Sequence, residues 1–302
     1  MKKKAAIVLM AILLADIVVI SGCGGKGTTT YDPDKVATKQ VEVSDIDISY
    51  REYGEGYPLV MLMGLSGTMD TWDPNFINEL SKNNRIVMLD YRGFGKTDLG
   101  SKPVTMKQYA DDTASLMDAL KITRANVLGW SLGTYVAQEF VIAYPEKTNK
   151  VVLYAADFGG EKAIMPTQEV INAMSDQSGT PEERERRVMD TLFPSEWLKN
   201  PENQEYLKKA FGEYADRPTG EGIKKQWEAW VSWQGTYDRL PQVKSETLLI
   251  AGASDINTPW QNTPLMFERL PNAWMTLIKD GGHGVMFQVP TKMANVINGF
   301  LE

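Results

Sequence analysis

Three residues of this 302-residue chain have types and positions that would support nucleophilic catalysis: Ser131, Asp255 and His283. Ser131 is the central residue of the pentapeptide Gly-Trp-Ser-Leu-Gly (129–133), which lies between an apolar run and a helix-like segment. A serine on a sharp strand-to-helix turn needs glycines on both sides, because larger side chains would collide with the neighbouring strand and helix. Such a turn lifts the hydroxyl clear of the sheet and directs the first amides of the helix, including that of Leu132, toward a developing oxyanion.

A nucleophilic serine needs a base that accepts its proton and an acid that orients the base. His283 is the only histidine in the chain, so it must be the base, and any mechanism that needs two histidines is excluded. For the acid we favour Asp255, on the turn after an apolar run, with Asp157 as the alternative because it also follows such a run. The order Ser131, Asp255, His283 is expected when the three residues follow successive strands of one α/β sheet.

Each of these residues also has an ordinary structural interpretation. A Gly-x-Ser-x-Gly pentapeptide is short enough to recur by chance, and an isolated histidine in a glycine-rich turn is more often a surface residue. Asp255 on its own would be a turn aspartate that hydrogen-bonds to nearby backbone. The catalytic interpretation is favoured because the order of the residues and their positions after apolar runs agree independently.

The elements that must position these residues alternate along the chain. Residues 41–50 alternate apolar and polar side chains, as expected for a half-buried hairpin or edge pair. Runs expected to be buried on both faces, typical of parallel strands covered by helices, lie at 58–63, 85–89, 125–128, 151–154, 247–250 and 274–278. Helical segments are predicted at 76–82, 106–120, 135–142, 263–270 and 291–300. This alternation predicts an α/β fold with a doubly wound, mostly parallel sheet.

One long interval without a convincing strand interrupts the alternation, at about residues 157–245. An ordinary connection between strands is much shorter, so we interpret this interval as an inserted helical cap over the carboxyl edge of the sheet. It contains Trp227, Trp230 and Trp233, whose spacing places them on a slowly drifting helix face. We expect these tryptophans to pack in the core rather than to contact a ligand, unless their helix lies over Ser131.

From about residue 41 to residue 302 the chain resembles the α/β-hydrolase superfamily. Residues 89–98 (Leu-Asp-Tyr-Arg-Gly-Phe-Gly-Lys-Thr-Asp) are similar to the Asp-x-Arg-Gly-x-Gly-x-Ser segment that is common in that superfamily. Residues 63–67 (Met-Gly-Leu-Ser-Gly) occupy the place where many members have His-Gly-x before an oxyanion-hole amide. The resemblance therefore implies that the backbone amides of Leu65 and Leu132 form the oxyanion hole.

Two departures from the superfamily pattern concern the surroundings of the nucleophile. Met63 replaces the usual histidine, which mainly braces the oxyanion loop, so this change bears on the geometry of the loop rather than on the triad. Thr134 stands where close relatives often have glycine. A serine at the elbow separates the chain from the dehalogenase and epoxide hydrolase branches, whose nucleophile is aspartate.

The N-terminal residues resemble a bacterial lipoprotein signal. Three lysines are followed by an apolar stretch, interrupted once by Asp16, and then by Ile-Ser-Gly-Cys ending at Cys23. The resemblance implies a signal peptide at 1–22 and acylation of Cys23, which would anchor the protein to a membrane outside the cytoplasm. An uncleaved membrane anchor is the alternative, but the apolar stretch is shorter than the ~20 residues that span a bilayer. Residues 23–39 would then be a flexible tether, and 40–302 the hydrolase domain.

Composition narrows the range of partners and cofactors. The net charge of −7 at pH 7 argues against nucleic acid as a partner, because no basic stripe would offset phosphate charge. A single histidine and a single cysteine leave no plausible zinc cluster, and we expect neither a metal nor an organic cofactor. The hydrophobic content of 43% is ample for a buried core.

We therefore expect a carboxylic ester hydrolase that acts on a small or medium apolar ester, or on a lactone, through an acyl-enzyme. Trp130, beside the nucleophile, and Phe287, beyond the histidine, are expected to help form an apolar pocket. The superfamily resemblance also admits perhydrolysis and carbon–carbon bond hydrolysis by the same triad. The alternative from a different class is a binding protein that keeps the hydrolase fold without turnover. The oligomeric state is left open.

Overall fold

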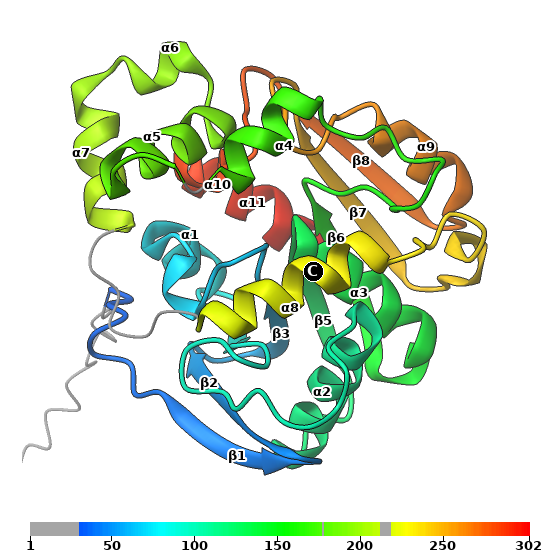
Figure 1. Cartoon of the computed structure of the whole chain (residues 1–302). Helices are drawn as coiled ribbons and strands as arrows, with labels where there is room; N and C mark the ends of the chain where they lie inside the picture. The colour runs from blue at the N-terminus through cyan, green and yellow to red at the C-terminus, as the bar shows by residue number, and fades with distance from the viewer. Residues whose placement is uncertain (1–29, 177, 212–218) are drawn as a thin grey trace, which may run out of the picture. The chain divides into compact units, whose positions relative to one another are not determined.

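In the computed structural model, which describes residues 30–176, 178–211 and 219–302, eight strands form one sheet (Figure 1). The strands are β1 (Lys39–Val43), β2 (Ile46–Tyr53), β3 (Tyr57–Leu62), β4 (Asn84–Leu89), β5 (Ala125–Trp130), β6 (Thr148–Tyr154), β7 (Glu246–Gly252) and β8 (Ala273–Ile278). Their order across the sheet is β1-β2-β4-β3-β5-β6-β7-β8. β1 and β2 are antiparallel to each other, and β2 is antiparallel to β4, whereas the pairs from β4 to β8 are parallel.

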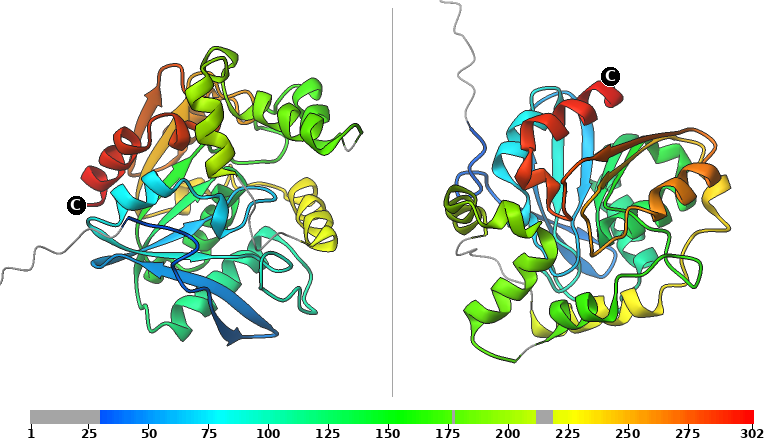
Figure 2. Two further views of the ribbon diagram at one scale, coloured as in Figure 1. Left: turned by 90° about the vertical axis from the view of Figure 1, so that its left-hand side faces the viewer. Right: turned by 90° about the horizontal axis from the view of Figure 1, so that it is seen from above.

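Helices cover both faces of the sheet, as the doubly wound prediction requires. They are α1 (Pro74–Leu80), α2 (Met106–Ala119), α3 (Leu132–Ala143), α4 (Gln168–Ser175), α5 (Pro181–Leu192), α6 (Ser195–Leu198), α7 (Pro201–Ala210), α8 (Gly220–Ser232), α9 (Asn262–Arg269), α10 (Val285–Gln288) and α11 (Pro290–Leu301). α1 packs with α11 on one face, and α2 packs with α3 on the other, where α9 also lies (Figure 2). The predicted fold class is confirmed.

Helices α4–α8 lie between β6 and β7, and we call them the cap. None of the described residues between these two strands forms a strand, in agreement with the helical insertion predicted at about 157–245. Polar residues begin most of these helices, because a side-chain oxygen at the first position satisfies a free N–H of the first turn. The cap residues that do so are Thr167 (α4), Thr180 (α5), Asn200 (α7) and Thr219 (α8).

The last strand, β8, departs from the prediction that it is buried on both faces. Its burial pattern is mixed, and Trp274, Met275 and Leu277 are exposed, Trp274 at 63% of its surface. β8 is one of the two edge strands of the described sheet and pairs only with β7, whereas β3, β5, β6 and β7 have a strand on both sides. An apolar run has the same composition at an edge as at the centre, so the pattern alone did not distinguish them.

The predicted tether at 23–39 is also too long, because its second half belongs to the fold. Tyr31 is only 3% exposed, and its backbone N–H donates to the side chain of Asn78. Its ring meets the ring of Tyr53 at 5.1 Å. The folded unit accordingly begins at Tyr31. The polar composition predicts a loop, and the structure shows that loop attached to the sheet through the aromatic side chain of Tyr31.

The signal peptide predicted at 1–22 and the predicted lipidation site Cys23 lie outside the described residues. Among the helices that the structure does describe, none has both the length and the apolar character needed to cross a membrane.

Candidate active site

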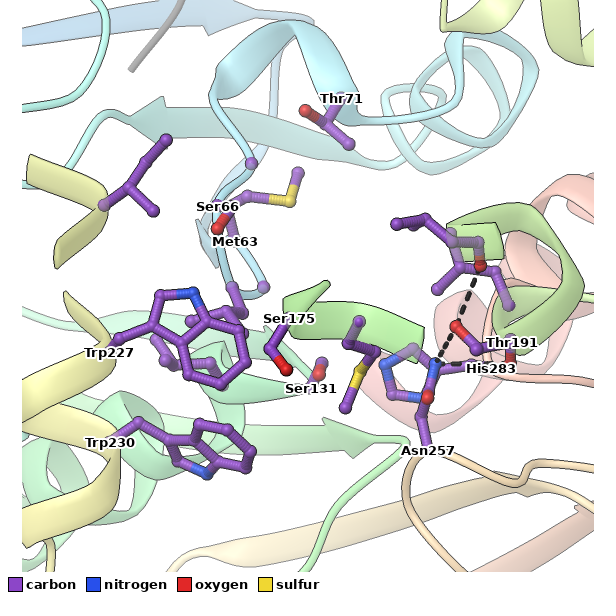
Figure 3. Close-up of a pocket in the computed structure, with 18 of the residues that line it drawn as sticks. Met63, Ser66, Thr71, Ser131, Ser175, Thr191, Trp227, Trp230, Asn257 and His283 are labelled. Carbon is purple, nitrogen blue, oxygen red and sulfur yellow. Dashed lines mark hydrogen bonds between the residues drawn. The ribbon is translucent and has the colours of Figure 1, made fainter. Parts of the chain in front are cut away.

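Ser131 occupies the sharp turn between β5 and α3 that its sequence predicted. Its φ is +55° and its ψ is −125°, a conformation that is strained for a residue with a side chain. The flanking glycines are required by close packing: a Cβ at Gly133 would overlap the carbonyl oxygen of Leu62, and one at Gly129 would overlap that of Gly133. Sterics therefore force the serine out of the regular strand and helix and leave its hydroxyl facing the cavity shown in Figure 3.

Thr134, one of the departures from the superfamily pattern, reinforces this turn. Its hydroxyl donates to the carbonyl of Ser131 at 2.7 Å, and its backbone N–H donates to the same oxygen at 2.8 Å. The N–H of Ser131 donates in turn to the carbonyl of Tyr154 on the neighbouring strand β6, at 3.0 Å. The threonine is thus compatible with the elbow and supplies one of its hydrogen bonds.

His283 and Asp255 form a buried hydrogen-bonded pair. His283 Nδ1 lies 2.9 Å from Asp255 Oδ2, and the two residues are 4% and 5% exposed. The second carboxylate oxygen of Asp255 accepts the backbone N–H groups of Asn257 at 2.9 Å and of Thr258 at 2.8 Å. With the carboxylate held by three donors, Nδ1 is fixed as the protonated nitrogen and Nε2 is left as the acceptor.

Ser131 and His283 line the same cavity, from the carboxyl ends of β5 and β8 respectively (Figure 3). No hydrogen bond joins their side chains in the part of the chain that the structure describes. Catalytic hydrogen bonds are often long before a substrate is bound, so this separation is compatible with a serine–histidine couple. The three predicted residues therefore meet at one edge of the sheet.

The alternative acid, Asp157, has different partners. Its carboxylate accepts the hydroxyl of Tyr135 at 2.7 Å and the backbone N–H of Gly159, also at 2.7 Å. Burial raises the pKa of Asp157, and the hydrogen bond from Tyr135 opposes that shift. The structure places Asp255 rather than Asp157 against the imidazole of His283.

The loop that carries Leu65 lies beside the nucleophile. A Cβ on Gly64 would be 3.3 Å from the Cβ of Ser131, so a larger residue here would crowd the serine. Leu65 and Leu132 both line the cavity, and the N–H groups of both residues make no hydrogen bond within the described residues. Two unpaired amides at this position are the arrangement that an oxyanion hole needs.

Met63, the other departure from the superfamily pattern, braces this loop by packing. Its side chain fills the space beside Gly67, where a Cβ would be 2.8 Å from the sulfur. Its carbonyl accepts the hydroxyl of Tyr91 at 3.1 Å.

Further along the loop, the N–H of Met69 donates to the buried carboxylate of Asp90 at 2.7 Å. Burial raises the pKa of Asp90 to about 7.

The cavity above Ser131 has a volume of about 1020 Å³ and is enclosed mainly by cap residues. Its apolar walls include Met174, Met189, Leu192, Phe211, Trp227 and Trp230. Trp227 and Trp230 therefore face the cavity and contact each other at 5.0 Å, contrary to the expectation of core packing. Their helix, α8, lies over Ser131, which is the one case in which the sequence allowed these tryptophans to contact a ligand.

Two other aromatic predictions had different outcomes. Trp233 does pack, stacking on Tyr135 at 4.3 Å and donating its indole N–H to Glu139 at 2.8 Å. Trp130 lines the cavity as expected, but Phe287 does not. Phe287 is 2% exposed and packs behind the cavity wall, 4.7 Å from the ring of Phe211. It supports the pocket without lining it.

The cap also holds the loops of the acid and the base, which no sequence motif indicated. Asn257 donates its side-chain amide to the carbonyl and the hydroxyl of Thr191, both at 3.2 Å (Figure 3). The backbone N–H of Gly284 donates to the carbonyl of Leu192 at 2.9 Å. The only local signal was the Asp-x-Asn spacing of a side-chain turn at 255–257.

No group of three or more histidine, cysteine or acidic side chains among the described residues could hold a metal ion.

The parallel sheet with its elbow serine and buried histidine–aspartate pair is the arrangement typical of α/β hydrolases. A sequence profile described as "alpha/beta hydrolase fold" matches residues 57–290, and the chain belongs to the α/β-hydrolase family.

Known proteins similar to this chain are consistent with that membership. A poly(3-hydroxyalkanoate) depolymerase of Ectopseudomonas oleovorans is 27% identical over 248 residues, which cover 81% of this chain and 84% of the relative. An α/β hydrolase fold protein from Chitinophaga pinensis has a TM-score of 0.77 and 24% identity, covering 90% of this chain and 99% of its own. The enol-lactonase from Burkholderia xenovorans LB400 has a TM-score of 0.72 and 21% identity, covering 87% and 99%. The family and its relatives support a general hydrolase activity.

Proposed function

We propose that this protein is a serine hydrolase that cleaves an ester-like or lactone substrate through an acyl-enzyme. The observation that carries the proposal is the convergence of a strained Ser131 and a buried His283–Asp255 pair on one apolar cavity. Strain at an elbow serine and burial of a histidine–carboxylate pair are both costly, and such costs are typical of catalytic sites.

The proposed mechanism follows from the roles that each group can fill. His283 Nε2 removes the proton of Ser131 as the hydroxyl oxygen attacks the substrate carbonyl, and the amides of Leu65 and Leu132 stabilise the resulting oxyanion. Collapse of the tetrahedral species expels the alcohol, which takes the proton from His283 and leaves an ester on Ser131. Water activated by His283 then attacks this ester and releases the acid. Asp255 holds the imidazole in the required tautomer throughout.

The cavity favours an apolar substrate of small or medium size. Its volume of about 1020 Å³ accommodates more than an acetyl group, and sulfur-containing, aliphatic and aromatic side chains form most of its wall. The similarity to a poly(3-hydroxyalkanoate) depolymerase and to an enol-lactonase is consistent with an ester or lactone substrate. Arg184, on α5, and Lys224, on α8, also line the cavity.

A panel of p-nitrophenyl esters of increasing acyl length tests the proposal. We expect turnover that rises with acyl length and then falls once the chain exceeds the cavity, and we expect Ser131→Ala to lower kcat by at least about 10⁴-fold. Equal activity of Ser131→Ala and the wild type would refute the assignment. Binding of esters without turnover by a folded wild-type protein would favour a ligand-binding role.

We further propose that acylation of Cys23 anchors the protein to a membrane outside the cytoplasm. The proposal is supported by the three N-terminal lysines, the apolar stretch that follows them and the Ile-Ser-Gly-Cys sequence ending at Cys23. Two or more acyl chains suffice for stable anchoring. We expect the mature protein to begin at Cys23, to partition into detergent and to be released by Cys23→Ser. Recovery of the Cys23→Ser protein in membranes with residues 1–22 intact would instead indicate an uncleaved anchor.

A further inference from the structure

Gln226, on helix α8 of the cap, forms a hydrogen bond with the loop that carries the Leu65 amide, one of the two proposed oxyanion donors. Its side chain is fully buried, and its Oε1 accepts the backbone N–H of Ser66 at 2.7 Å, 160 residues away in sequence. Ser66 directly follows Leu65 and, like it, lines the cavity. The hydrogen bond therefore joins the cap to the peptide next to the proposed oxyanion donor.

The conformation of this loop needs such a restraint. The N–H of Gly67 donates to the carbonyl of Gly64 at 3.3 Å, which closes a four-residue turn with Leu65 and Ser66 at its centre. Ser66 has a φ of +60°, in the left-handed region that disfavours residues with a side chain. Because peptide units are planar, rotations about the backbone of Leu65 change the relative directions of its own N–H and that of Ser66. Holding the Ser66 N–H therefore limits the directions that the Leu65 N–H can take.

The two ends of the Gln226 amide face different groups. Its Nε2 is buried beside the hydroxyl of Tyr109, which is also buried. Its Oε1 is the atom that accepts the Ser66 N–H, so a methionine of similar length would fill the same space but could not make this bond.

We propose that Gln226 is a positioning residue that holds the Leu65 amide in the direction needed to stabilise the oxyanion. The inference rests on the proposed serine hydrolase function. In this protein a residue of the cap thus supports the loop that begins at Met63, where the superfamily usually has a bracing histidine.

Helix α8 is held in place independently of Gln226, so substitutions at this position should leave the fold intact. At its N-terminal end, the N–H and the hydroxyl of Thr219 donate to the carbonyl of Gly93 at 3.0 and 3.1 Å. Gly222 lies so close to the same carbonyl that a Cβ there would overlap it. At the other end, Trp233 and Arg239 each bond to Glu139, at 2.8 Å.

The test compares Gln226→Met, Gln226→Glu and the control Thr219→Ala with the wild type. Methionine keeps the length of the side chain but cannot accept the Ser66 N–H. Glutamate keeps an acceptor for the Ser66 N–H, and the neighbouring buried hydroxyl of Tyr109 can donate to its other oxygen. Thr219→Ala removes a contact between α8 and the body of the protein without touching the oxyanion loop. Each protein is assayed for kcat and KM on the best p-nitrophenyl ester and for the rate of labelling by an alkyl fluorophosphonate.

An oxyanion stabiliser acts in the tetrahedral state, so its loss should lower kcat more than it changes KM. We expect Gln226→Met to lower kcat and the labelling rate by about 10- to 100-fold, with KM within about threefold of the wild type. Gln226→Glu should recover most of this loss, and Thr219→Ala should lower the melting temperature without lowering kcat. A kcat for Gln226→Met equal to that of the wild type, or a loss that Thr219→Ala reproduces, would overturn the inference while leaving the proposed function standing. A wild-type protein that neither hydrolyses esters nor is labelled at Ser131 would overturn the proposed function, and the inference with it.

Discussion

Trp130 and His283 are joined by a hydrogen bond of 3.1 Å from the indole N–H to the backbone carbonyl. The residue that precedes the nucleophile therefore fixes the loop of the base. The hydroxyl of Tyr154, on the next strand, donates to the same carbonyl and also accepts the N–H of Met286 at 3.3 Å. Two side chains at the carboxyl ends of β5 and β6 thus hold the backbone of the loop that carries the imidazole.

Removal of the Tyr154 hydroxyl should loosen this loop. Tyr154→Phe keeps the buried ring, which stacks on Trp130 at 6.1 Å, and deletes only the hydrogen bonds. We expect a loss of about 1–3 kcal/mol in the free energy of unfolding and a fall in kcat of roughly tenfold. Urea denaturation and steady-state kinetics measure the two effects. If unfolding changes and kcat does not, the hydroxyl stabilises the sheet without positioning His283.

The two buried aspartates near the site should respond differently to neutral substitution. Asp255→Asn should lower kcat by about 10⁴-fold in a protein that still folds, because an amide at this position favours the wrong imidazole tautomer. Asp157→Asn should retain most of the activity, because its partners are Tyr135 and Gly159 rather than the base. Kinetics on the same ester decide between them. Loss of activity in Asp157→Asn with retention in Asp255→Asn would reverse the assignment.

Asp90 should make the stability of the fold depend on pH. Burial raises its pKa from 3.8 to about 7, so the folded state favours its neutral form. A group with a raised pKa contributes stability that is fully present below the unfolded value of about 4 and is lost as the pH rises through about 7. We expect the wild type to be more stable at pH 5.5 than at pH 8.5 by on the order of 2 kcal/mol from this group.

Asp90→Asn isolates this contribution. Asparagine has nearly the same shape and keeps an oxygen that can accept the N–H of Met69, but it does not titrate. Urea denaturation of both proteins at the two pH values should show a smaller pH difference in the variant. An identical difference in the two proteins would show that Asp90 does not titrate in this range.

Much of the site could be predicted because its signals are local. The turn at Ser131, the strand ends before Asp255 and His283, and their order all depend on short stretches of sequence. The bond from Gln226 to Ser66 joins residues 160 positions apart and has no local signature. The same reason explains why the placement of Trp227 over the cavity was not foreseen.

The fold was predicted well where burial is uniform and less well at its margins. A strand such as β5, buried along its whole length, has a continuous apolar pattern that indicates its environment. The apolar run of β8 has the same pattern, although among the described strands only β7 pairs with it. The polar residues around Tyr31 predict a tether, whereas the burial of its large side chain places this segment in the fold.

Truncation should reveal the contribution of Tyr31. A protein that starts at Thr30 should be as stable and as active as the full chain, because it keeps the folded unit. A protein that starts at Lys39 loses Tyr31 and also Thr38, which accepts a hydrogen bond of 2.9 Å from Arg51. We expect the second truncation to lower the free energy of unfolding by about 2–4 kcal/mol. Thermal and urea denaturation of the two proteins test this. Equal stability of the two would show that residues 31–38 do not stabilise the fold.

The attachment of Tyr31 to the sheet also sets how far a lipidated form could stand from its membrane. Tyr31 is eight positions after Cys23, whereas Lys39 is sixteen. A chain spans at most roughly 3.5 Å per residue, so the reach from an acylated Cys23 to the folded unit falls from about 56 Å to about 28 Å. Such a short connection would keep the folded unit close to the bilayer surface. Substrates that partition into or accumulate at that surface would meet the enzyme at a higher local concentration than those in free solution.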